Sequence, residues 1–236
     1  MTSWIRLLVL GLLGISLLFK TCAADVNTLT AEELRQGWSL LFDGKSTVGW
    51  RGFGKAEFPT NGWDVTNGWL HHQSKGGGGD IITKQQFQNF ELSFEWRIAP
   101  AGNSGLKYFI DEKRGAPIGH EYQLIDDAAH PDASHGPKRQ TAALYDALPP
   151  VHPPVRKAGE INSSRLIVRG NHVEHWLNGM LVLEYVLGSP EMIAAKASSK
   201  FKGETRWGTR FPTPILIQDH GDEVWLRNIK IRQTIP

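Results

Sequence analysis

Four clusters of polar residues hold the side chains of this sequence that are best equipped for chemistry. They occupy residues 103–105, 119–126, 139–145 and 218–222, at or beside predicted strands. Successive side chains of a strand point to opposite faces, so Glu121 and Gln123 share one face, as do Gln218 and His220. If the alternate residues Tyr122 and Leu124 face the core, Glu121 and Gln123 project together from the opposite face.

These residue types suit carbohydrate. Amide, carboxylate, guanidinium and imidazole groups bond to hydroxyls, and indole rings stack on the apolar C–H faces of sugars. A sheet face that carries Asn, Glu, Gln, Arg, His and Trp is therefore suited to sugar recognition. A structural alternative stays open, in which Glu121 and Arg139 form an ion pair and Gln218 caps a strand edge.

The usual signatures of other chemistries are absent from the sequence. There is no Gly-x-Ser-x-Gly elbow, no His-Glu-x-x-His pair and no Walker loop. His172 and His175 lie three apart on a predicted strand, so they point to opposite faces and cannot share a metal without a bulge. Four glycines at residues 76–79 are not followed by Lys-Ser or Lys-Thr, which favours a surface loop over a phosphate loop.

Short strands separated by turn residues account for most of the chain after residue 37. The clearest is 89–98, where Phe90, Leu92, Phe94, Trp96 and Ile98 alternate with polar residues. Similar strands are predicted at 106–110, 121–125, 164–169, 172–177, 215–218 and 224–231. Asn-Gly pairs at 67–68 and 178–179 are typical of tight hairpins. Helices are predicted only at 30–36 and at 190–200, the latter with Met192, Ile193 and Ala197 on its apolar side. The pattern predicts one all-β domain, an antiparallel β-sandwich or barrel.

Charge and cysteine content exclude two broad classes. The 236 residues include 26 Lys and Arg against 24 Asp and Glu, a net charge of +2, which argues against a dedicated nucleic-acid binder. A single Cys excludes a disulfide scaffold and a Cys-based zinc cluster.

The first 24 residues have the pattern of a secretory signal. Arg6 precedes an apolar run at 7–19, and Lys20 and small residues follow it up to Ala24. The run is short for a membrane span, which needs about 20 residues, and no later segment is long and apolar enough. We expect cleavage after Ala24 and export to the periplasm or the extracellular space, with lipid attachment at Cys22 as the alternative. Residues 25–37 then lead into a domain at 38–236.

Taken in order, the polar clusters and their flanking motifs resemble the 3-keto-disaccharide hydrolase domain family. The matching stretches are LLFDGK at 40–45, GW at 49–50, WDV at 63–65, GWL at 68–70, FEL at 90–92, EWR at 95–97, NSGL at 103–106, HEYQ at 120–123 with Asp126, TAALY at 141–145, GE at 159–160 with Asn162, WLNG at 176–179, QDHGD at 218–222 and RNI at 227–229. Two positions depart from the family pattern: Ala142 stands where a Gly is frequent, and Ile161 stands where a Trp usually precedes the Asn.

The resemblance implies a concanavalin A-like jelly roll and an exported enzyme that acts on glycosides oxidised at C3 of a sugar ring. The C3 ketone acidifies the hydrogen on C2, so the chemistry requires a base and a positive group beside the developing enolate. We expect Glu121 or His220 to be the base and Arg139 to stabilise the enolate. Asn103, Gln123, Gln218 and Tyr145 would bind the substrate, and Trp96 or Trp207 would stack on a ring.

The resemblance leaves three matters open. A divalent metal held by Glu121, His220 or the acidic residues Asp126 and Asp127 is compatible with it, and no cofactor is certain. The expected partner is a small carbohydrate, not a nucleic acid, and the oligomeric state is not predicted. The alternative function is a non-catalytic, lectin-like carbohydrate-binding module, because the same sandwich serves both roles.

Overall fold

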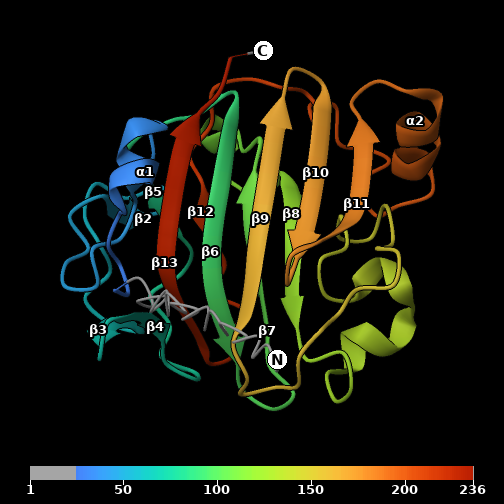
Figure 1. Ribbon diagram of the computed structural model, residues 1–236. Helices are drawn as coiled ribbons and strands as arrows, with labels where there is room; N and C mark the ends of the chain where they lie inside the picture. Colours follow the sequence, from blue (N-terminus) through green and yellow to red (C-terminus); the bar gives the residue numbers. More distant parts are fainter. Residues whose placement is uncertain (1–24, 236) are drawn as a thin grey trace, which may run out of the picture.

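Two antiparallel β-sheets packed face to face form the body of the molecule (Figure 1). The computed structural model describes residues 25–235, so the predicted signal segment and Cys22 lie outside the described residues. The larger sheet has the strand order β11-β10-β9-β6-β13-β4-β3, with β1 also paired to β13, and the smaller has the order β2-β5-β12-β7-β8. The predicted all-β antiparallel sandwich of the jelly-roll class is confirmed.

The strands are short and are joined by turns and loops. Their bounds are β1 (Ser39–Leu40), β2 (Trp50–Gly52), β3 (Trp63–Thr66), β4 (Trp69–His72), β5 (Ile81–Thr83), β6 (Phe90–Ile98), β7 (Asn103–Tyr108), β8 (His120–Ile125), β9 (Asn162–Arg169), β10 (His172–Leu177), β11 (Met180–Val186), β12 (Leu216–Ile217) and β13 (Val224–Gln233). The helices are α1 (Ala31–Arg35) and α2 (Pro190–Ala197), with 3-10 turns at η1 (Glu112–Arg114), η2 (Pro131–His135) and η3 (Pro137–Arg139). Within residues 25–235, neither helix has the length and hydropathy of a membrane-spanning segment.

Local sequence determines several of these elements. The Asn67-Gly68 and Asn178-Gly179 pairs join β3 to β4 and β10 to β11, and all four residues have positive φ, as a tight hairpin turn requires. Helix α1 begins with the expected capping box, in which the Thr30 side chain and the Glu33 backbone N–H are bonded.

Helix α2 packs through a face that matches the predicted one only at Met192. Met192 and Ala195 are buried, whereas Ile193 and Ala197 are exposed. The prediction for Ile193 and Ala197 is wrong because an i, i+3 pair is enough to seat this short helix, and Ile193 falls outside that stripe.

The core between the sheets contains a chain of hydrogen bonds among buried His and Tyr side chains. His175 Nδ1 donates to the carbonyl oxygen of Ala142 at 2.9 Å, so its Nε2 must accept from the Tyr108 hydroxyl at 2.7 Å. Tyr108 then accepts from Tyr185 at 2.7 Å, and Tyr185 accepts from His120 Nδ1 at 2.8 Å. This assignment takes both histidines as neutral, as burial makes them at pH 7, and it then places every proton in the chain. His172, by contrast, lies at the surface, so the predicted opposite placement of His172 and His175 is confirmed.

The two buried histidines make stability dependent on pH. Desolvation lowers the pKa of His120 to about 3 and that of His175 to about 4. Since an unfolded His titrates near pH 6.5, only the unfolded chain takes up these protons between about pH 6.5 and 4. The free energy of unfolding should therefore fall as the pH is lowered, by about 2–3 kcal/mol between pH 7 and 5.5 for two such groups.

Urea denaturation at several pH values measures this fall. A His175→Gln variant, although less stable, should show about half the dependence on pH, whereas His135→Gln, at an exposed side chain, should show all of it. A free energy of unfolding that stays constant between pH 7 and 5.5 would contradict the neutral assignment.

Candidate active site

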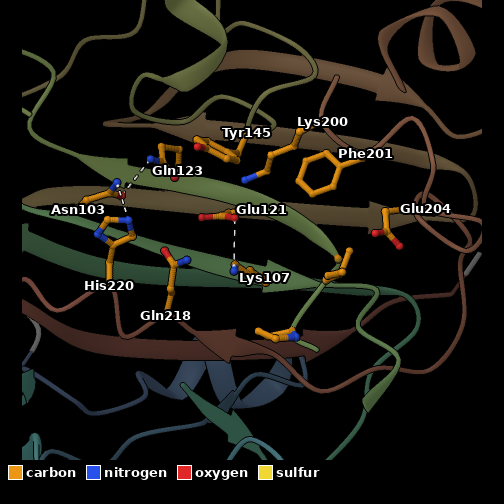
Figure 2. Close-up of a pocket in the computed structure, with 13 residues that line it drawn as sticks. Asn103, Lys107, Glu121, Gln123, Tyr145, Lys200, Phe201, Glu204, Gln218 and His220 are labelled. Atoms are coloured by element: carbon orange, nitrogen blue, oxygen red, sulfur yellow. Dashed lines mark hydrogen bonds and ion pairs between the residues drawn. The ribbon is translucent and has the colours of Figure 1, made fainter. Parts of the chain in front are cut away.

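A pocket of about 380 Å³ opens on the face of the smaller sheet that points away from the core (Figure 2). Its floor is formed by β7, β8 and the segment that follows β12, and residues 117–119, 145 and 200–204 form its walls. Tyr122 and Leu124 are buried in the core while Glu121 and Gln123 line the pocket, so the predicted division of faces along β8 is confirmed.

Strand register brings a carboxylate and an ammonium group together at the centre of the floor. Lys107 on β7 is paired directly with Glu121 on β8, and their Nζ and Oε2 atoms are 3.6 Å apart. Both residues are largely buried. In Figure 2 this pair lies at the centre of the pocket, with Lys200 and Phe201 beyond it on one side and Gln218 and His220 on the other.

A row of amides leads from the floor to His220. Gln123 Nε2 donates to Asn103 Oδ1 at 3.0 Å, which leaves the Asn103 NH₂ group to face His220 Nε2 at 3.4 Å. In this arrangement His220 Nε2 carries a lone pair. The amide oxygens of Gln123 and Gln218 are buried and have no hydrogen-bond partner among the described residues. Both residues line the pocket, so these two oxygens are suited to accept hydroxyl hydrogens from a sugar.

Aromatic rings and a second lysine form one wall. Lys200 Nζ lies 4.1 Å from the centre of the Tyr145 ring. Partial burial lowers the pKa of the Lys200 ammonium group. Of the neighbouring charges, Glu121 raises this pKa and Lys107 lowers it further. The Tyr145 hydroxyl donates to Asp132 at 2.7 Å, and burial together with that carboxylate raises the pKa of Tyr145. Tyr145 thus offers its ring to the pocket and not its hydroxyl.

Arg139 does not reach the position expected of an enolate stabiliser. Its guanidinium donates to Asp132 at 2.6 Å and to Asp146 at 2.9 Å, and it does not line the pocket. The Asp132 carboxylate raises the pKa of Arg139. The expectation is corrected: the cations in the pocket are Lys107 and Lys200, and Arg139 supports the wall through Asp132 and Tyr145. The alternative Glu121–Arg139 ion pair is likewise replaced by Glu121–Lys107.

Neither tryptophan proposed for ring stacking is available to a ligand in this pocket. Trp96 is 1% exposed in the core, where its Nε1 donates to Ser164. Trp207 is 3% exposed because Phe201 stacks on it, with ring centres 4.8 Å apart. Phe201 lines the pocket in its place.

The residues expected to hold a metal are not gathered together. Asp126 uses its two carboxylate oxygens on the backbone N–H groups of Ala101 and Ala128 and lies outside the pocket. Among the described residues, the one group of three His, Cys, Asp or Glu side chains with ligand atoms within 4.8 Å of one another is His130, His220 and Asp222. His130 Nδ1 accepts from the Asp132 N–H at 3.0 Å, so its Nε2 carries the proton and has no lone pair for a metal. The donor set present does not fit the expected metal.

Gly105 lies directly beside the Glu121 carboxylate, so a substitution at Gly105 tests whether the position of Glu121 matters. A Cβ atom built at Gly105 would lie 2.3 Å from Glu121 Oε1, so Gly105→Ala must displace the carboxylate. A displacement of about 1 Å in a catalytic group can cost about 10²-fold in rate, and we expect a loss of turnover of that order with little change in the melting temperature. Gly203→Ala is the matched control, because nothing lies within 4 Å of its Cβ position. Equal turnover in the two variants would contradict a role for the position of Glu121.

The sequence and the fold of this chain are similar to those of known proteins. The sequence matches the family described as 3-keto-alpha-glucoside-1,2-lyase-like domain over residues 37–232. It is 34% identical over 242 aligned residues to a 3-keto-disaccharide hydrolase of Bacteroides thetaiotaomicron, covering 89% of this chain and 83% of that protein. Two crystal structures from Parabacteroides distasonis, both described as glycosyl hydrolases, are also similar. One has a TM-score of 0.81 at 33% identity, covering 89% of this chain and all of that one. The other has a TM-score of 0.63 at 27% identity, covering 84% and 99%.

Proposed function

Because the chain belongs to the 3-keto-alpha-glucoside-1,2-lyase-like domain family, we propose that it is an enzyme that cleaves the glycosidic bond of 3-keto-glucosides and 3-keto-disaccharides. The observation that carries the proposal is the composition of one pocket face. There His220, the Lys107–Glu121 pair and two glutamines whose amide oxygens have no hydrogen-bond partner among the described residues all line the same pocket.

The chemistry has two stages. In the first, a base takes the proton from C2, the electrons of that C–H bond form an enolate with the C3 carbonyl, and the enolate expels the C1 oxygen. The leaving oxygen gains a proton, and an enone remains. In the second, water adds to C1 and a proton returns to C2, so the sum of the two stages is hydrolysis. No carboxylate nucleophile is needed, unlike in ordinary retaining glycosidases.

The pocket residues supply the groups that this route requires. His220 is the proposed base, because its Nε2 is the unprotonated ring nitrogen and imidazole is the commonest general base. In the free protein this lone pair accepts from the Asn103 amide at 3.4 Å, a long contact that the C2–H of the substrate would replace. Lys107 places positive charge at the centre of the floor, where it would stabilise an enolate oxygen. Glu121 holds Lys107 in place, and Gln123 and Gln218 bind sugar hydroxyls.

The substrate preference is the test of this function. Wild-type protein is incubated with a 3-keto-glucoside and with its unoxidised parent, and release of the aglycone is followed for each. We expect turnover of the oxidised glycoside only, because the parent has no carbonyl to acidify C2–H. Binding of both sugars in a calorimeter without turnover of either would favour the carbohydrate-binding module instead.

We also propose that the protein is exported, with residues 1–24 as the signal. The charged start, the apolar run and the small residues before position 25 support this proposal. Expression in a bacterial host, fractionation and N-terminal sequencing test it. A mature N-terminus at Asp25 in the exported fraction agrees with the proposal, and an uncleaved chain in the cytoplasm contradicts it.

A further inference from the structure

Asp222 is a carboxylate beside the pocket residue His220, and the proposed reaction assigns no role to it. Its Oδ2 atom lies 3.5 Å from His220 Nδ1, on the side of the imidazole ring opposite the Asn103 contact. A carboxylate can only accept at that nitrogen, whereas the Asn103 NH₂ group can only donate at the other. The two neighbours therefore demand the same tautomer of His220, with the proton on Nδ1 and the lone pair on Nε2.

Buried groups hold both the side chain and the backbone of Asp222. The backbone N–H of Asn103 donates to Asp222 Oδ2 at 3.0 Å, and His72 Nδ1, at a side chain with no exposed surface, donates to the Asp222 carbonyl at 2.9 Å. On its other side, His72 Nε2 lies 3.0 Å from Asp219 Oδ1, which also accepts from the Gly221 N–H at 2.9 Å. The segment from Asp219 to Asp222 is thus fixed at both ends.

A second histidine faces the same carboxylate. His130 Nε2 lies 3.9 Å from Asp222 Oδ2. Because His130 Nδ1 is occupied by the Asp132 N–H, the proton of His130 is on Nε2 and points toward Asp222. The groups that face Asp222 Oδ2 are therefore the backbone N–H of Asn103, the Nε2–H of His130 and His220 itself.

We propose that Asp222 is a positioning residue that fixes the tautomer and orientation of His220 and stabilises the imidazolium that forms when His220 takes the C2 proton. The inference rests on the proposed function for its consequence in catalysis, but the tautomer is a property of the free protein. If the Asp222 carboxylate is removed, His220 can adopt the tautomer that carries its proton on Nε2. In that tautomer Nε2 has no lone pair, so His220 cannot act as the base.

The tautomer is measured by nitrogen-15 NMR of the histidine side chains at neutral pH, with the His220 signals assigned by their loss in His220→Gln. Wild-type protein should show His220 protonated on Nδ1, and Asp222→Asn should shift the population toward Nε2–H. Glu223→Gln is the matched control, because this neighbouring carboxylate contacts His71 instead. His220 already protonated on Nε2 in wild type, or unchanged in Asp222→Asn, overturns the proposal.

Kinetics with a 3-keto-glucoside supply the second readout. Removing a carboxylate that orients a catalytic histidine lowers kcat by up to about 10⁴-fold, so Asp222→Asn should lose about 10²–10⁴-fold in kcat with KM nearly unchanged. Asp222→Glu should recover part of the rate, which shows that the site still folds. A wild type with the expected tautomer but no turnover would overturn the proposed function and not the placement of His220. Full activity of Asp222→Asn would overturn the positioning role.

Discussion

Replacing His220 with glutamine is expected to lower kcat on 3-keto-glucosides by about 10²–10⁴-fold, the usual contribution of a general base. Glutamine fills a similar space and keeps hydrogen bonding to Asn103, so the pocket should persist, but its amide oxygen cannot take the C2 proton. Substrate affinity should change little, because Gln123 and Gln218 still hold the sugar. Steady-state rates measured across pH 5–9 check this expectation.

His172→Gln is the control for the His220 variant. His172 lies on β10 in the other sheet, is partly exposed and does not line the pocket, so the rate of this variant should equal that of wild type. A His220→Gln enzyme that retains wild-type kcat would remove His220 from the proton transfer and would leave Glu121 as the base, the other candidate from the sequence.

Replacing Lys107 with methionine is the second substitution that we expect to lower kcat strongly. The ammonium group is nearly enclosed beside Glu121, and a charge in such a site stabilises a developing oxyanion far more strongly than it would in water. We expect a loss of about 10²–10³-fold in kcat, comparable to the loss of one oxyanion-stabilising donor. Burial raises the pKa of Asp80 and Lys107 lowers it, so Asp80 should take up its proton at a higher pH in the variant than in wild type.

Lys107→Met leaves the Glu121 carboxylate without its partner, and the double variant Lys107→Met/Glu121→Gln removes that complication. If Lys107 acts on the enolate, the double variant should stay as slow as the single one, although its melting temperature recovers. Lys84→Met, at an exposed position, is the charge-matched control. Recovery of the rate in the double variant would show that the unpaired carboxylate, not the missing cation, caused the loss.

Period-two alternation predicted the part of the site that lies on one strand. It placed Glu121 and Gln123 on the same face, and the structure puts both in the pocket. The same rule could have found Lys107, which shares a face of β7 with Asn103. The strand predicted from the sequence begins at residue 106, so Asn103 and Lys107 were not placed on one strand. The rule also grouped Trp96 with Phe94 and Ile98 on a buried face, which conflicts with the stacking role that the sequence analysis gave it.

The remaining pocket residues depend on contacts that no local pattern encodes. Lys200 and Phe201 follow α2 and line the pocket, where Phe201 packs on Trp207 and the Lys200 backbone N–H donates to Asp146. Arg139 carries the charge that the chemistry requires, but Asp132 and Asp146 hold it behind the wall. Which cation faces a pocket is determined by the loops that supply its carboxylate partners, and the paths of those loops come from tertiary packing.

The central claim, removal and return of the C2 proton, is tested most directly by cleaving a 3-keto-disaccharide in D₂O and trapping the product at once by reduction. The route through the enone predicts deuterium at C2 of the released 3-keto sugar, seen by mass spectrometry and by loss of the C2 proton signal. As a control, the released 3-keto sugar is kept in D₂O with the His220→Gln variant for an equal time. Deuterium that appears at C2 in this control measures the uncatalysed exchange. A product that retains its C2 hydrogen in full, at normal turnover, would contradict the account.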